Sequence, residues 1–134
     1  MGLKRRSREL ALQMLFQMDM GTVKLKDVEE NFLPNTSAPE MAKVMALRMV
    51  KNTWENVGDI DRHLRGLATN WDLARMAAVD RNILRLAAYE ILYDAEIPKS
   101  VAINEAIEIV KRYSTDESSK FVNGILDKLN KQKT

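Results

Sequence analysis

Apolar residues recur along almost the whole chain with the 3.6-residue period of an α-helix. No segment shows the sustained two-residue alternation of a half-buried strand. This pattern predicts an all-α fold of about seven helices joined by short connections. The predicted helices cover residues 4–20, 27–33, 37–58, 59–67, 80–93, 98–113 and 114–130, with a short helical turn after Trp71.

Residues that favour or stop helices set the predicted boundaries. Ser37, followed three residues later by Glu40, forms a capping signature for the third helix. We expect that helix to stop at Gly58, and either Asp59 or Asp61 to cap the fourth helix.

The segment 80–93 is apolar around most of its circumference, which is typical of a helix that its neighbours bury on all sides. We therefore expect two small helical bundles packed around this helix, in a single domain over residues 1–134. The best internal seam is at residues 57–61, which would give subdomains 1–58 and 59–134.

The first predicted helix has two different faces. Its buried stripe is predicted to contain Leu10, Ala11, Met14, Leu15 and Met18. The opposite, exposed face is predicted to carry Arg5, Glu9, Leu12 and Phe16. The helix thus combines a basic start with an outward-facing aromatic ring.

This combination is unfavourable for stability alone. Cations in a first turn oppose the helix dipole by roughly 0.3–1 kcal/mol each, and an exposed ring at Phe16 gains little from burial. Guanidinium groups bind phosphates and a ring stacks under an unpaired base, so the pattern favours a single-stranded RNA site. The alternative is a solvated helix end with Phe16 packed beneath a neighbouring helix.

The seventh predicted helix, capped by residues 114–116, carries a second basic and aromatic pair. Phe121 lies at the edge of the buried stripe, with Lys120 beside it. Periodicity alone favours a core role for Phe121, and the functional alternative makes Lys120 and Phe121 a further RNA contact. Gly124 in mid-helix costs about 1 kcal/mol relative to alanine, so we expect another segment to approach the backbone closely there.

Composition narrows the chemistry. The 134 residues include no cysteine and one histidine, His63, which disfavours disulfides, thiol catalysis and a zinc site. We predict no catalytic residue, no cofactor and no metal, and hence no enzyme. The formal net charge is only +2, so a nucleic-acid footprint must be local. The obvious candidate is Lys4, Arg5, Arg6 and Arg8. No apolar stretch suits a membrane span or a signal peptide, so we expect a cytoplasmic protein.

Four segments resemble the NusB family of bacterial transcription antitermination factors: residues 5–16, 80–90, 101–107 and 120–127. They occur in the family's order, and the resemblance covers essentially the whole chain. It implies an all-helical, non-enzymatic protein that pairs with NusE, a ribosomal protein. Together the two proteins would hold the boxA element of nascent ribosomal RNA transcripts, so that the RNA polymerase complex resists termination.

The resemblance also implies roles for individual residues. The implied RNA contacts are Arg5, Arg6, Arg8, Phe16, Lys120 and Phe121. Relatives often have tyrosine at the position of Phe16, so stacking would survive here without the phenolic hydrogen bond. Asp80 and Glu117 match acidic positions linked to contact with RNA or NusE.

Two other functions remain open. The chain could be a protein–protein adaptor whose arginines only solubilise the N-terminus. It also resembles the helical N-terminal domain of ribosomal RNA cytosine methyltransferases, but those enzymes need a large cofactor-binding domain and a cysteine nucleophile, so this chain would be a detached module. A homodimer that masks the arginines would regulate access to RNA.

Overall fold

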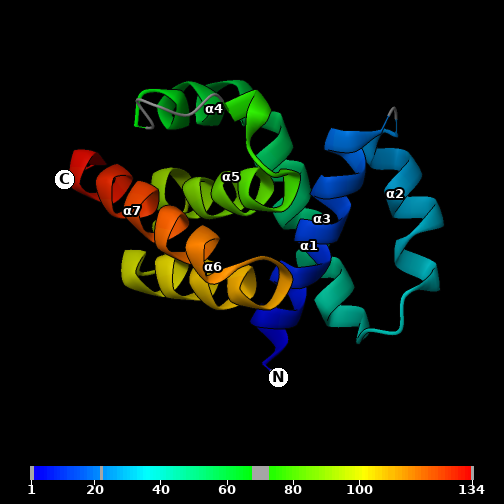
Figure 1. Cartoon of the computed structure of the whole chain (residues 1–134). Coiled ribbons are helices and arrows are strands. Elements are labelled where there is room, and N and C mark those ends of the chain that lie inside the picture. The colour runs from blue at the N-terminus through cyan, green and yellow to red at the C-terminus, as the bar shows by residue number, and fades with distance from the viewer. Residues whose placement is uncertain (1, 22, 68–72, 134) are drawn as a thin grey trace.

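The computed structural model describes residues 2–21, 23–67 and 73–133. Within these ranges the chain forms seven α-helices and no strand, which confirms the predicted fold class (Figure 1). The helices are α1 (Leu3–Met20), α2 (Leu25–Asn31), α3 (Glu40–Glu55), α4 (Val57–Arg65), α5 (Ala78–Tyr93), α6 (Lys99–Tyr113) and α7 (Asp116–Lys133). None of these helices combines the length and apolar character needed to cross a membrane.

Two short 3₁₀ turns lie in the connections, η1 (Leu33–Asn35) and η2 (Leu73–Arg75). The second is the helical turn predicted after Trp71, although Trp71 itself lies outside the described residues.

The helices form two groups that meet at α5. Figure 1 shows α1, α2 and α3 on one side and α4 to α7 on the other. Helix α5 packs against α1, α3, α4, α6 and α7, and its buried side chains point to every side, as the apolar circumference predicts. The predicted stripe of α1 is also confirmed, because its five residues from Leu10 to Met18 are all buried in the same core.

Two predicted helix boundaries are wrong. Ser37 does not cap α3, because Pro39 occupies the N-cap position with extended backbone (ψ 143°) and helical conformation starts only at Glu40. Helix α3 ends before Gly58, because the Asn56 side-chain amide donates a hydrogen bond to the Asn52 carbonyl at 2.8 Å and closes the helix there. Gly58 instead lies exposed in the first turn of α4.

The start of α4 has no side-chain cap. Asp59 lies in its first turn, and Asp61 is turned into the core, where Arg85 of α5 binds it. The predicted cap by Asp59 or Asp61 is therefore wrong, because Asp61 binds Arg85 over a long sequence separation and neither side chain caps α4. The cap predicted for α7 is confirmed at Thr115, whose hydroxyl oxygen accepts the Ser118 backbone N–H at 3.0 Å.

Charged side chains join α1, α4 and α5 inside the protein. Arg85 donates from Nε and Nη2 to the two carboxylate oxygens of Asp61, both at 2.9 Å. Arg81 donates from Nε to Asp19 Oδ2 at 2.7 Å, and Asn82 donates to the same oxygen at 2.9 Å. We call these five residues the buried arginine network.

Candidate nucleic-acid interface

The first turns of α1 place three cations at the surface. Lys4 is exposed. The Arg5 side chain is 39% exposed, and its Nε donates to Glu105 Oε2 of α6 at 2.7 Å. This hydrogen bond raises the pKa of Arg5 above its ordinary value, so the group stays charged. The Arg6 side chain is 29% exposed, with Nη1 3.8 Å from Glu9 Oε1.

Arg8 does not share this exposure, although the sequence pattern groups it with the other cations. Its side chain is buried, and its Nε and Nη2 donate to the two oxygens of Glu90 at 2.8 and 3.1 Å. Burial raises the pKa of Glu90, and the hydrogen bonds from Arg8 oppose that shift. The pair anchors the start of α1 to the end of α5.

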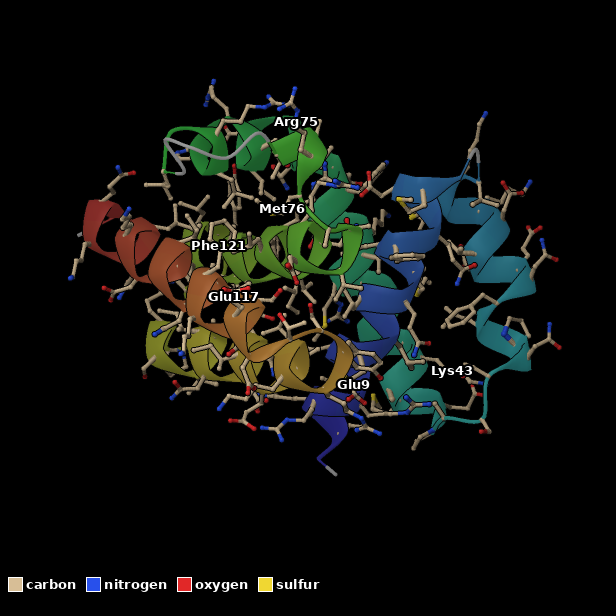
Figure 2. All side chains as sticks on the ribbon, in the orientation of Figure 1. Glu9, Lys43, Arg75, Met76, Glu117 and Phe121 are labelled. Carbon is tan, nitrogen blue, oxygen red and sulfur yellow. The ribbon has the colours of Figure 1, made fainter. Side chains whose placement is uncertain are left out.

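Phe16 lies further along α1, and its side chain is 38% exposed, as predicted. Glu9 and Leu12, predicted on the same exposed face, are instead buried. The C-terminal end of α6 reaches this face, where Arg112 Nη1 donates to Glu9 Oε2 at 3.0 Å. Figure 2 shows Glu9 on α1 close to the connection between α6 and α7. The exposed face of α1 is therefore interrupted between its basic start and its aromatic ring.

Helix α7 keeps Lys120 exposed and Phe121 half-buried against the hydrophobic core. The position of Phe121 agrees with the core role that periodicity favours. The close approach expected at Gly124 is wrong, because a Cβ added there would meet no described atom within 4 Å. Gly124 lies on the exposed side of α7, so no packing constraint on its backbone explains the glycine.

The two acidic candidates differ in exposure. Glu117 is exposed in the first turn of α7 (Figure 2). Asp80 is buried at the start of α5, and its Oδ2 accepts a hydrogen bond from the Ser118 hydroxyl at 2.8 Å. Asp80 thus ties the start of α7 to α5, whereas Glu117 offers its carboxylate to solvent.

Arg112 and Tyr113 were not among the residues that the sequence singles out. The Arg112 side chain is 56% exposed, and its guanidinium carbon lies 5.9 Å from the centre of the Tyr113 ring. Tyr113 is itself exposed. The sequence does contain a run of two basic residues and one aromatic residue at 111–113. However, Arg112 contacts Glu9, which lies 103 residues away in the sequence, and only the tertiary structure reveals this contact.

No metal centre emerges from the described part of the chain, where no three acidic or histidine side chains are grouped so that they could hold an ion. Among the described residues this part of the surface carries partly or fully exposed cations on α1, the exposed ring of Phe16, and the guanidinium of Arg112 beside the exposed ring of Tyr113.

Comparisons with known proteins place the chain in a family. The model of the NusB family matches residues 5–131. The transcription antitermination protein NusB of Trichlorobacter lovleyi is 46% identical, over 96% of this chain and 91% of that protein. The protein of the same name from Chloroherpeton thalassium is 45% identical over 92% of this chain, which spans only 59% of that longer protein.

Solved structures agree. The structure of T. maritima NusB has a TM-score of 0.85 and 40% sequence identity, and the match covers 96% of this chain and 91% of that one. A structure described as the antitermination factors NusB and NusE in complex with dsRNA has a TM-score of 0.81, covering 97% of both chains, but at 23% identity it supports the fold alone. Matched along nearly its whole length by the family model and by these relatives, the chain belongs to the NusB family.

Proposed function

We propose that this protein is a transcription antitermination factor that binds boxA-type single-stranded RNA of ribosomal RNA transcripts together with NusE, through the basic start of α1. The observation that carries the proposal is that one helix presents an exposed lysine and ring, Lys4 and Phe16, and two partly exposed arginines, Arg5 and Arg6. Relatives at 45–46% identity are transcription antitermination proteins, and a protein of the same fold occurs in a structure with NusE and RNA.

The chemistry assigns different tasks along α1. Lys4, Arg5 and Arg6 supply charge to phosphates, and Arg5 and Arg6 add planar donor groups. Phe16 supplies a ring on which one base can stack. Arg8 supports the site from beneath, because a direct contact with RNA would require it to leave its buried pair with Glu90.

The residues of α7 and α5 extend the proposal. Lys120 is exposed and can contact RNA, with Phe121 holding its part of α7 against the core. The exposed carboxylate of Glu117 repels phosphate, so we assign it to NusE rather than to RNA. Asp80 acts indirectly by holding Ser118 and hence the start of α7.

The role is one of binding, within a complex that includes RNA polymerase, and no step of catalysis is assigned to this chain. The adaptor alternative draws support from the ion pairs of Arg5, Arg6 and Arg8, which already engage three of the four N-terminal cations. The detached methyltransferase module and a masking homodimer have no comparable support in the geometry.

The test is a fluorescence anisotropy titration of a short boxA RNA and a scrambled RNA of equal composition, each with and without NusE. We expect saturable binding that prefers boxA, strengthens with NusE and weakens as salt rises, because cations that bind phosphates displace counterions. Equal affinity for both RNAs in the presence of NusE would refute the proposal.

A further inference from the structure

Glu9 is a buried carboxylate placed between two arginines from different helices. Its side chain is 1% exposed. Arg112 Nη1 of α6 donates to Oε2 at 3.0 Å, and Arg6 Nη1 of α1 lies 3.8 Å from Oε1, which accepts no hydrogen bond among the described residues. A buried carboxylate needs such cationic neighbours, so Glu9 keeps both guanidinium groups close to one point of the surface.

We propose that Arg112 and Tyr113 at the end of α6 form a second RNA-contacting pair, which Glu9 joins to the basic start of α1. This inference rests on the proposed RNA-binding function and adds two residues and a second helix to its site. Arg112 would contact a phosphate next to the one that Arg6 contacts, and Tyr113 would stack with a base.

The position of Arg112 supports this assignment. Arg6 and Phe16 are ten residues apart, about 15 Å along the helix axis. On this side of α1, Glu9 and Leu12 lie between them and are buried, and Gln13 is partly exposed but carries no charge. Arg112 lies over Glu9, and so it places a positive charge where the face of α1 has none.

Exposure separates Arg112 from a purely structural arginine. Its side chain is 56% exposed while it holds Glu9, whereas Arg8, which has a comparable carboxylate partner, is almost completely buried. The guanidinium also lies 5.9 Å from the ring centre of Tyr113, a residue that is 37% exposed. An exposed arginine beside an exposed ring provides both the phosphate contact and the stacking platform of a single-strand site.

A structural account of Arg112 makes a different prediction. A cation in the last turn of α6 interacts favourably with the helix dipole, and it neutralises Glu9. If that were its whole role, replacing Arg112 would lower stability and leave RNA affinity unchanged.

The experiment uses the full chain with NusE and boxA RNA, and it compares Arg112→Gln and Tyr113→Leu with a matched control, Arg62→Gln. Arg62 is also an exposed, ion-paired arginine, but it lies on α4, away from the start of α1 (Figure 1).

We expect Arg112→Gln to weaken RNA binding about fivefold to tenfold and to lower the salt slope by about 0.7, the value for one phosphate contact on a single strand. Tyr113→Leu should weaken binding about fivefold with the salt slope unchanged. Arg62→Gln should bind within about twofold of the wild type.

The outcomes separate this inference from the proposed function. Unchanged RNA affinity and salt slope in Arg112→Gln, with boxA still preferred over the scrambled RNA, would overturn the inference and leave the proposed function standing. A wild-type protein that does not prefer boxA would overturn both. Urea unfolding of each variant checks folding. If Arg112→Gln fails to fold, Tyr113→Leu decides, because its side chain is exposed and holds no buried charge.

Discussion

Two groups of arginines in this protein use the same chemical group in opposite ways. At the start of α1, Arg5 and Arg6 each form one ion pair among the described residues and stay about one-third exposed. In the buried arginine network, the side chains of Arg81 and Arg85 are at most 10% exposed. Arg85 meets two aspartates from α1 and α4, and Arg81 also donates to the Met76 carbonyl at 2.9 Å.

The difference lies in how many protein acceptors surround each guanidinium. A buried arginine needs acceptors for its donors, because an unpaired buried charge costs several kcal/mol. The α5 arginines meet this need inside the protein, so they join helices. The guanidinium groups of Arg5 and Arg6 on α1 keep part of their surface in contact with water, and a phosphate can replace that water. Arg8 combines features of both groups. It lies on α1 with Arg5 and Arg6, but it is buried against a carboxylate like Arg81 and Arg85.

The largest effect is expected in the buried network. Arg85→Ala removes the partner of Asp61 and leaves that carboxylate buried and unpaired, so the free energy of unfolding should fall by about 3–5 kcal/mol. Urea denaturation measures this change. A loss below about 1 kcal/mol would show that Asp61 reaches water without Arg85, and the contrast between the two groups would fail.

A smaller effect with a defined pH dependence is expected at Asp19. Burial acts to raise the pKa of its carboxyl, but the hydrogen bonds from Asn82 and Arg81, together with the positive charges of Arg85 and Arg81, outweigh burial and lower the pKa below the ordinary 3.8. A carboxyl with a lowered folded-state pKa stabilises the protein above its unfolded pKa, and this contribution is lost as pH falls through the folded pKa. Asp19→Asn should therefore cost about 2 kcal/mol at pH 7 and progressively less below about pH 4.

Urea unfolding of both proteins at several pH values tests this prediction. A difference in unfolding free energy that stays constant from neutral to acidic pH would mean that the charge of Asp19 contributes nothing. A suitable comparison is Glu40→Gln, because Glu40 is exposed and pairs with Lys43 only at 3.4 Å on the surface of α3. That variant should show no comparable pH-dependent loss.

The fold could be predicted from the sequence further than the site could. Helical periodicity is local, so it gave the helices, the buried stripe of α1 and the central position of α5. The exposure of residues on the outward face of α1 is harder to predict. Arg8 is buried with Glu90, 82 residues further along the chain, and Glu9 is buried with Arg112, 103 residues further along. A helical wheel contains no information on such partners. For the same reason the local pattern offers Asp61 as one of two caps and does not reveal its ion pair with Arg85.

The exposed aromatic ring illustrates the opposite situation. The helical projection predicts that Phe16 is exposed, and in the described structure its side chain is partly open to solvent. The pattern therefore predicts exposure correctly where no distant element covers the helix, and it is wrong where α5 and α6 do.

The most direct test of the account is a paired measurement on the double variant Arg5→Ala, Arg6→Ala: its affinity for boxA RNA with NusE, and its unfolding free energy in urea. We expect RNA affinity to fall about tenfold to hundredfold while the unfolding free energy changes by less than about 1 kcal/mol, because Arg5 pairs with a partly exposed carboxylate and the buried Glu9 keeps its hydrogen-bonded partner Arg112 when Arg6 is removed. Unchanged RNA affinity would contradict the account and favour the adaptor function, whatever the change in stability.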